Sequence, residues 1–532
     1  MMRRLVLSLF ACIALALSAA ANAAPLPGPI DVPEGPEGVA APGGQAAPDI
    51  GGKAPEGAPA IAAFSESVLP GEALVATGMG LEGVTLKVWH GGKTARDVKP
   101  LRAAGDRLAA VLPENAPAGT MLIWPETDGR LGAPIRVGGT TAWWLWPARA
   151  RTGREGSTVR LFGRNLSVKG ASPRIYIEGE GASRWLETLA SNPYAIEAAL
   201  PKALKPGEYW VWAHNGTGGR FGWSEPQRLR VIADPMAKKF PVVNVDDHGA
   251  VPDDGKDDAP AIEKALAEAA RLCDKGPGAE VRFSKGTYRI SRTLTTTDWA
   301  REGGLRIVGA GMGKYDPSTK EVSGAATTIA IVEGKRSLPE LVHLQTPRSS
   351  VEGITFVMKA PSNKWQKGLG VYAPDVRIAR CRFVCLDTRP EPAKRQITLN
   401  QGPIYINVPG EADIEVLHCE VYTPAYGIQV ADQPPGHNSN DLCPPATESV
   451  RIAHCTVVGT YRGPLVEAKD RARPGPTGAH SRGICNYNGQ RLIVEQCTFR
   501  SLAQKKGQIL GRMIRSGNSS IRHLYFADNR GH

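Results

Sequence analysis

The C-terminal half of the chain repeats one line of sequence, and such a repeat restricts the fold more than any other feature. Gly-initiated apolar elements alternate with the repeated line, so that each turn carries two alternating strands at a period of roughly 27 to 42 residues. This pattern predicts a parallel β-helix with variable loops. The repeated lines are Leu305–Val308, Val351–Phe356, Val376–Phe383, Ile414–Val421, Val450–Val457, Leu492–Phe499 and Ile521–Phe526. The second elements are Gly368–Tyr372, Gly402–Ile406, Gly427–Val430, Gly463–Val466 and Gly483–Asn486.

Alignment of the repeated lines places one apolar residue of each coil in a single column. Stacked coils hold parallel side chains about 4.8 Å apart, slightly too far for good disulfide geometry. We therefore expect a buried ladder with free thiols. The column contains Ile354, Cys381, Cys419, Cys455, Cys497 and Leu524. Pairing among Cys385, Cys443 and Cys485 stays open, and no Cys/His group has the spacing of a zinc site, so no metal centre is predicted.

A short module precedes the repeats. Val243–Leu266 indicates a strand, a polar turn and an amphipathic helix, and Val281–Ile290 indicates a second strand. Asp257 and Asp258 stand just before the helix, where carboxylates accept hydrogen bonds from unpaired amides and suit the helix dipole. Together these features predict a helix anchored at its N-terminus and packed by one apolar face.

This order of elements resembles the opening module of the pectate lyase superfamily of right-handed parallel β-helices, which includes polygalacturonase-like proteins. The resemblance covers Phe240 to the end of the chain. It implies that the helix covers the open end of the coil stack and that the aspartates of the turn are structural rather than metal ligands. It implies an architecture and leaves the activity open.

The N-terminus has the pattern of a secretory signal over residues 1–23. Arg3 and Arg4 precede an apolar run, Leu5–Leu17, and Ala21-Asn22-Ala23 forms a small-x-small cleavage site. We expect cleavage near Ala23 and a secreted or periplasmic protein. The run is too short to span a bilayer with confidence and no later segment is long enough, so no membrane insertion is expected.

Residues 24–60 are dominated by Pro, Gly and Ala, which predicts a disordered linker. Residues 61–140 and 141–235 are related by an internal repeat, in which Leu69–Leu81 matches Gly153–Leu166. Each copy has short alternating strands broken by Gly/Pro turns and resembles an immunoglobulin-like β-sandwich. The expected fold class is thus all-β, with two immunoglobulin-like sandwiches before a right-handed parallel β-helix over residues 240–532.

Both sandwiches are rich in Trp, which core packing explains more simply than an aromatic platform for sugar rings. Trp143, Trp144 and Trp146 are an exception, because three neighbouring side chains cannot all enter one core. At least one of them is expected at an interface or in solvent.

The formal net charge is +12, so acidic polysaccharide or an anionic surface is a plausible partner, although solubility alone also explains it. The chain lacks evenly spaced aromatic and basic residues of the kind that bind single strands, and no nucleic-acid partner is expected. The oligomeric state is left open.

Two polar insertions follow the second element of successive coils and should be neighbours, because coils stack in register. They are Asp432–Pro445 and Glu467–Arg482. We predict a groove there. Its catalytic candidates are Asp432, Asp470, His480 and Arg482, and its substrate-binding candidates are His437, Lys469, Arg471 and Arg473. A pair of solvated charged loops is the simpler interpretation.

Two mechanisms suit these residue types. A lyase neutralises a uronate carboxylate with Arg or Ca²⁺ and removes the adjacent proton with a Lys, Arg or His base. An inverting hydrolase needs two carboxylates about 6.5–9.5 Å apart, for which Asp432 and Asp470 are the nearest fit. No cofactor is assigned beyond Ca²⁺ in the lyase case.

We therefore expect a polysaccharide-active protein that binds, and as an enzyme cleaves, an acidic polysaccharide. The alternative is a non-catalytic surface or adhesive protein that binds glycan, which the absence of polygalacturonase catalytic signatures favours. An epimerase or depolymerase on the same fold is a third reading. Because Gly531-His532 follows a coil strand directly, we also expect the chain to be C-terminally incomplete.

Overall fold

The computed structural model divides the chain into two compact units, Met1–Ile232 and Ala233–His532. It describes residues 35–37, 39–41, 54–91, 94–152, 157–180, 182–234, 239–297, 303–334, 337–360, 366–387, 401–424, 426–430, 447–460, 482–486, 489–502, 512–516 and 524–531. Within them no helix is long and apolar enough to cross a membrane.

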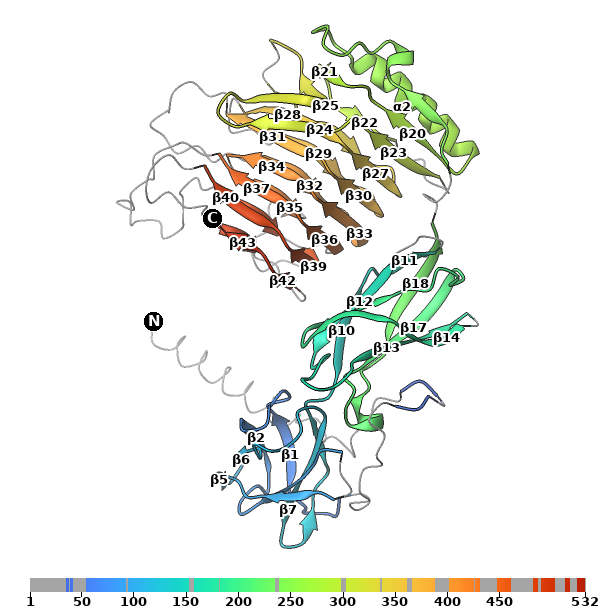
Figure 1. The fold of residues 1–532 in the computed structure, drawn as a ribbon. Helices are drawn as coiled ribbons and strands as arrows, with labels where there is room; N and C mark the ends of the chain where they lie inside the picture. Colours follow the sequence, from blue (N-terminus) through green and yellow to red (C-terminus); the bar gives the residue numbers. More distant parts are fainter. Residues whose placement is uncertain are drawn as a thin grey trace, which may run out of the picture. The chain divides into compact units, whose positions relative to one another are not determined.

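The first sandwich consists of two antiparallel sheets around a core that includes Leu74, Leu86 and Leu108 (Figure 1). One sheet has the order β1 (Ala60–Phe64), β2 (Ala73–Met79), β6 (Arg107–Val111) and β5 (Arg102–Ala104). The other has the order β4 (Arg96–Val98), β3 (Thr85–Trp89), β7 (Met121–Thr127) and β8 (Arg130–Leu131), with β9 (Ile135–Val137) also paired to β7.

The second sandwich repeats this two-sheet plan around Leu161, Ile177 and Val211. One sheet has the order β10 (Thr141–Trp146), β12 (Thr158–Arg164), β16 (Ala195–Ala199) and β15 (Thr188–Asn192). The other has the order β11 (Arg149–Thr152), β18 (Gln227–Ala233), β17 (Gly207–His214), β13 (Arg174–Gly179) and β14 (Ala182–Leu186), and a 3-10 turn, η1, spans Gly219–Gly222.

The three neighbouring tryptophans of β10 divide as predicted. Trp144 and Trp146 are buried, whereas Trp143 is 46% exposed. Trp144 stacks on Phe162 of β12 at a ring-centroid distance of 4.1 Å. Leu145, between Trp144 and Trp146, enters the sandwich core, so alternation along the strand places these two tryptophans on the outer face of the sheet.

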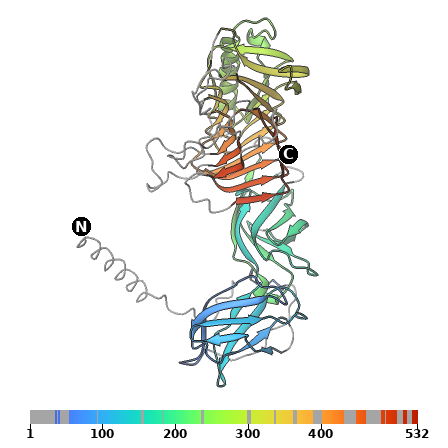
Figure 2. The same ribbon diagram turned by 90° about the vertical axis from the view of Figure 1, so that its left-hand side faces the viewer.

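The second unit is a parallel β-helix of three sheets, whose strands stack as successive rungs (Figure 2). The first sheet has the order β19 (Val242–Asn244), β20 (Gly278–Arg282), β23 (Gly304–Val308), β27 (Ser349–Glu352), β30 (Val376–Ala379), β33 (Gly410–Leu417), β36 (Thr447–Ala453), β39 (Gly489–Glu495) and β42 (Leu524–Ala527). The second has the order β21 (Gly286–Ile290), β25 (Glu321–Ile331), β28 (Ile354–Ala360), β31 (Arg382–Asp387), β34 (Glu420–Thr423), β37 (Thr456–Gly459), β40 (Thr498–Ser501) and β43 (Arg530–Gly531), with β24 (Met312–Asp316) antiparallel to β25. The third has the order β22 (Leu294–Thr295), β26 (Glu340–Leu344), β29 (Gln366–Val371), β32 (Gln401–Ile406), β35 (Tyr426–Val430), β38 (Arg482–Asn486) and β41 (Arg512–Ser516).

A coil therefore has three strands, where the sequence pattern predicts two. The line Val351–Phe356 turns at Gly353, with a φ of 69°, whereas the four lines between Val376 and Phe499 each contain two strands joined at a non-glycine residue with a positive φ, for example Arg380 at 50° and His418 at 52°. The left-handed conformation turns the chain sharply between the first and second sheets. Since the residues at these four turns are not glycines, the turns carry no obvious signal in the sequence.

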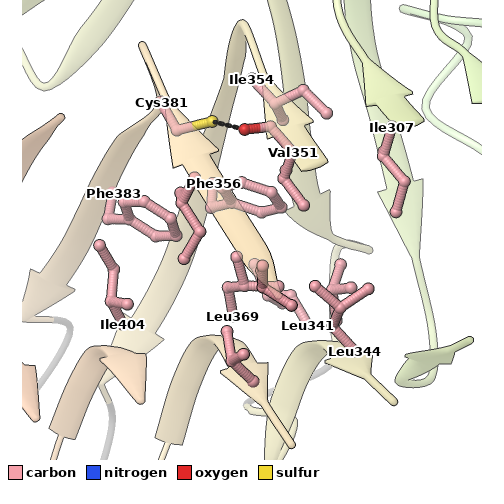
Figure 3. Packing of buried hydrophobic residues seen from close by; sticks show 14 of the residues in the cluster. Ile307, Leu341, Leu344, Val351, Ile354, Phe356, Leu369, Cys381, Phe383 and Ile404 are labelled. Carbon is pink, nitrogen blue, oxygen red and sulfur yellow. Dashed lines mark hydrogen bonds between the residues drawn. The ribbon is translucent and has the colours of Figure 1, made fainter. Parts of the chain in front are cut away.

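The cysteine column is confirmed and its last member is corrected. Each cysteine carbonyl accepts a hydrogen bond from the next coil, as in Thr456 N to Cys419 O at 2.8 Å, and Cys381, Cys419, Cys455 and Cys497 are buried free thiols. Figure 3 shows Cys381 within the core, its thiol directed at the Val351 carbonyl. The prediction of Leu524 in this column is wrong. Leu524 pairs with Leu492 in the first sheet, and the register places Asn529 beside Cys497.

The helix α2 (Ala259–Lys275) covers the first coils with its apolar face, as predicted. Asp258 accepts hydrogen bonds from the backbone N–H groups of Val251 and Arg289, at 2.9 and 2.8 Å. Asp257 accepts from the Ser291 N–H at 2.9 Å and from its hydroxyl at 2.6 Å. These aspartates thus join the start of the helix to β21 and its continuation. A 3-10 turn, η3, spans Asp246–His248 within the preceding acidic segment.

Candidate functional site

Most of the predicted site residues lie outside the described residues. They are Asp432, His437, Lys469, Asp470, Arg471, Arg473 and His480. The remaining one, Arg482, begins β38, where its backbone pairs with Tyr426 and Arg512.

The two predicted loops attach at different corners of the coil. Residues 431–446 connect β35 of the third sheet to β36 of the first, whereas residues 461–481 connect β37 of the second sheet to β38 of the third. The sequence reading places both after the same strand because it takes Gly463–Val466 as that strand. In the structure, the strand that follows β35 in the third sheet is β38. Both connections border the third sheet, one at the end of β35 and one at the start of its neighbour β38.

The outer face of the third sheet carries polar and aromatic side chains. The residues Leu369, Ile404 and Ile428 form an inward row that is fully buried in the core. Alternation along a strand then directs the next residues outward. The outward row runs His343, Gly370, Tyr405, Gln429 and Cys485 in register.

A hydrogen-bonded chain of side chains lies on this face, which we call the third-sheet cluster (Glu340, His343, Lys367, Tyr372 and Tyr405). His343 Nδ1 contacts one oxygen of Glu340. The Tyr372 hydroxyl donates to the other oxygen of Glu340 at 3.1 Å, and Lys367 Nζ donates to the Tyr372 oxygen at 2.7 Å. The phenol oxygen thus lies between an ammonium and a carboxylate.

A second set of contacts fixes the imidazole. Gln345 Nε2 lies 2.6 Å from His343 Nε2, and the His343 ring stacks on Tyr372 with centroids 4.2 Å apart. When the amide donates to Nε2, that nitrogen is the acceptor and Nδ1–H donates to Glu340. The imidazole therefore orients the carboxylate.

The ammonium of Lys367 also faces an aromatic ring. Its Nζ lies 3.8 Å from the centroid of Tyr405, and the Tyr405 ring lies 5.9 Å from that of Tyr372. A cation over a ring face is held by the ring quadrupole. Lys367 and Tyr372 remain partly exposed, whereas Tyr405 is buried.

Gly370 provides the space for this cluster. It sits between His343 and Tyr405 in register, and a Cβ there would lie 2.2 Å from Glu340 Oε2 and 2.6 Å from the Tyr372 ring. Any other residue at this position would displace the carboxylate. The glycine signal in Gly368-Leu-Gly-Val-Tyr372 is thus a packing requirement of the cluster as well as of the strand.

Two buried amides complete the surroundings. Gln429 lies beside Tyr405 on the outward row and is 0% exposed, and neither atom of its amide has a hydrogen-bond partner within the described chain. The same holds for Gln366 at the start of β29, which is 2% exposed. A buried amide without partners costs about 1–3 kcal/mol, so positions of this kind call for a functional explanation.

The sequence reading misses this cluster. Glu340 and His343 lie on β26, which belongs to none of the repeated lines, and the list of second elements begins one coil later. The spacing Glu340-x-x-His343-x-Gln345, with Lys367 and Tyr372 in the next coil, is the signal that could have indicated it. No group of three or more His, Cys, Asp or Glu side chains suited to a metal occurs in the part of the chain that the structure describes.

Comparisons with known proteins agree with this fold. Residues 242–370 match the family model described as rhamnogalacturonase A/epimerase, pectate lyase-like. The match covers the cap and the first coils, the part of the chain that carries the resemblance to the pectate lyase superfamily. No curated protein matches the chain.

Three similar solved structures share low sequence identity with this chain. The surface protein and adhesin PfbA of Streptococcus pneumoniae is 11% identical with a TM-score of 0.28, covering 55% of this chain and 97% of that chain. A family 28 exopolygalacturonase of Yersinia enterocolitica is 10% identical with a TM-score of 0.22, covering 74% and 98%. The Agl-KA catalytic domain is 10% identical with a TM-score of 0.29, covering 72% and 70%.

Proposed function

We propose that the protein is an exported polysaccharide lyase that binds an acidic polysaccharide on the outer face of the third sheet and cleaves it at the third-sheet cluster. One observation carries the proposal: the Tyr372 hydroxyl lies between Lys367 Nζ and Glu340 Oε2. The family match over residues 242–370 supports a polysaccharide substrate, since its description names rhamnogalacturonase and epimerase.

The arrangement suits β-elimination on a uronate. Tyr372 passes its proton to Glu340, and Lys367 stabilises the phenolate. The phenolate then takes the proton from the carbon next to the uronate carboxylate, whose charge the same ammonium partly neutralises. The bond from the neighbouring carbon to the leaving oxygen breaks and a carbon–carbon double bond forms. The leaving oxygen takes up the proton that Glu340 received, which regenerates the carboxylate. His343 holds Glu340 in place and is a positioning residue.

Hydrolysis requires a second carboxylate on the opposite side of the glycosidic bond. The described third-sheet cluster contributes one carboxylate, Glu340. Asp432 and Asp470 remain the proposed partners for a hydrolase, on the two connections that border this sheet.

A glycan-binding protein without activity is the second candidate. Both oxygens of Glu340 are already engaged, and the rings of His343, Tyr372 and Tyr405 form an aromatic array that could hold a sugar without reacting with it.

The test uses the full chain with polygalacturonate and rhamnogalacturonan, with and without Ca²⁺. Absorbance near 230–235 nm reports unsaturated uronate, and reducing ends report any cleavage. Tyr372→Phe should reduce kcat about 100-fold or more, the usual contribution of a positioned acid or base, with little change in KM. Tyr194→Phe, an exposed tyrosine of the second sandwich, is the matched control.

The outcomes separate the candidates. Reducing ends without absorbance favour hydrolysis and the two aspartates. Binding without either signal favours the glycan-binding protein. Cleavage that survives Tyr372→Phe removes the third-sheet cluster from the chemistry.

A further inference from the structure

A row of aromatic side chains crosses the outer face of the second sandwich. Tyr176 of β13 pairs in register with Trp212 of β17 on one side and with Trp185 of β14 on the other. Their neighbours Ile175, Ile177, Val211 and Ala213 enter the sandwich core, so the aromatic residues lie on the opposite face. The ring centroids are 5.3 Å apart for Tyr176 and Trp185, and 6.3 Å for Tyr176 and Trp212.

Trp223 and Arg174 flank this row. The Trp223 ring stacks on Trp185 at 5.2 Å and 15°, and the Arg174 guanidinium lies 4.5 Å from the Trp185 ring centroid. Aromatic faces assembled outside a core are not needed to hold the two sheets together. They are typical of a binding surface.

The chain itself covers the row. Val39 and Ala41 pack against Tyr176, Trp212 and Trp223, and Figure 1 draws this short segment in blue. A Cβ at Gly35 would lie 2.5 Å from Trp223 Cδ1 and Nε1. We call this described part of the segment the strap (residues 35–37 and 39–41); the disordered linker over residues 24–60 stays a prediction.

The strap leaves one polar group unpaired. Trp212 is 8% exposed, and its indole Nε1–H has no hydrogen-bond partner in the described structure. A buried indole N–H normally finds a partner. The strap residues that lie against the aromatic cluster, Gly35, Val39 and Ala41, have no side chain that accepts a hydrogen bond. The strap also contains Glu37, but its carboxylate makes no hydrogen bond to the indole in the described structure. A ligand with hydroxyl oxygens could supply this acceptor while its apolar ring faces rest on the aromatic row.

We propose that the row Trp212–Tyr176–Trp185 is a saccharide-binding site and that the strap competes with the saccharide for it. The strap buries few large side chains, so a polymer that offers many sugar rings can displace it by mass action. The site belongs to the first unit and does not depend on the cleavage proposed above.

The test is isothermal titration of the full chain with two probes, an oligogalacturonide and a neutral β-glucan oligosaccharide. Trp185→Ala should weaken binding of at least one probe about tenfold, and Trp212→Phe, which keeps an aromatic ring of smaller size and removes the N–H, should weaken it several-fold. Gly35→Val should displace the strap from Trp223 and strengthen binding about threefold or more. Trp143→Ala is the control, since Trp143 is exposed on the other sheet of the same sandwich.

A synthetic peptide of residues 35–41 should compete with the probe on the Gly35→Val variant. The site is overturned if Trp185→Ala and Trp212→Phe bind both probes as the wild-type chain does. It is also overturned if the wild-type chain and all variants, Gly35→Val included, bind neither probe. Binding that Gly35→Val leaves unchanged, while Trp185→Ala weakens it, would overturn competition by the strap. Binding lost only in Lys367→Ala would refute this site and leave the proposed lyase standing.

Discussion

Asn529 Oδ1 accepts a hydrogen bond from the backbone N–H of Cys497 at 2.8 Å, at the position that cysteines occupy in the preceding coils. Its Nδ2 donates to the Val494 carbonyl at 2.9 Å. In the preceding coils this position holds a cysteine thiol. Asn529 instead bonds to two backbone groups, the carbonyl of Val494 in β39 and the N–H of Cys497 in the turn that follows. At this coil the column of buried apolar side chains thus gives way to a side chain that satisfies backbone polar groups.

Asn529→Ala should loosen this coil without unfolding the rest. Loss of the two hydrogen bonds should lower the free energy of local opening by about 1–3 kcal/mol. Amide hydrogen exchange at Cys497 measures this directly. Asn529→Asp is the matched variant, because it keeps the acceptor for Cys497 and loses the donor to Val494, and its effect should be smaller. Equal protection in all three proteins would contradict the proposed role.

The buried thiols predict a loss of stability at high pH. Burial raises the pKa of Cys381 to about 12 and that of Cys273 to about 11, from an ordinary value of 9.0. Above pH 9.0 the unfolded chain loses thiol protons that the folded chain keeps, so the free energy of unfolding falls between pH 9.0 and about 12. Urea unfolding followed by far-UV circular dichroism should show a free energy of unfolding that falls across this window.

Cys381→Ala serves as the control for this prediction. It should cost stability at pH 8 by leaving a cavity. It should also flatten the decline above pH 9.0, because one titrating group is gone. Parallel pH profiles for the two proteins would show that the thiol does not titrate as its burial implies.

In the first unit, buried His214 should make the free energy of unfolding fall at acid pH. Burial lowers the pKa of His214 to about 4 from 6.5, and the neutral ring accepts from Gly216 N–H at 2.9 Å and donates to the Gly219 carbonyl at 2.8 Å. Below pH 6.5 the unfolded imidazole takes a proton that the folded one refuses. Stability is therefore complete above pH 6.5 and falls towards pH 4, by up to about 3 kcal/mol.

Tryptophan fluorescence during urea unfolding measures this effect, because only Trp299 and Trp365 lie outside the first unit. His214→Gln keeps one acceptor and one donor and should remove most of the acid dependence. If the variant retains the wild-type slope between pH 6.5 and 4, other groups cause it.

The coil architecture could be predicted because it rests on short-range signals. The cap module orders a strand, aspartates and an apolar helix face within few residues, and the cysteine line repeats in register. The number of strands per coil could not be predicted, since from Val376 onward the turn between the first and second sheets uses left-handed residues such as Arg380 and His418 rather than glycine. Leu524 was misaligned for a related reason: its apolar neighbours imitate the repeated line, while the residue that continues the column, Asn529, is polar.

The candidate site was harder to predict than the fold. Charged loops are conspicuous in a sequence, whereas the third-sheet cluster draws single residues from separate coils. Gln429 illustrates this. It lies in the predicted second element Gly427–Val430. The sequence of that strand is the same whether the outward glutamine contacts solvent or a substrate. Only burial without a hydrogen-bond partner distinguishes the two cases.

Gln429→Leu should therefore stabilise the protein and weaken substrate binding. Leucine has a similar size and removes a buried amide that has no partner in the described residues, so the free energy of unfolding should rise by about 1 kcal/mol. We propose that this amide, which lies beside Tyr405 of the third-sheet cluster, pairs with substrate hydroxyl groups. Its loss should therefore raise the Kd for an oligogalacturonide about tenfold. Gln345→Leu is the matched control, because Gln345 Nε2 contacts His343 and its loss should destabilise. A destabilised Gln429→Leu protein with unchanged Kd would show that this glutamine is a structural residue whose role lies outside the third-sheet cluster.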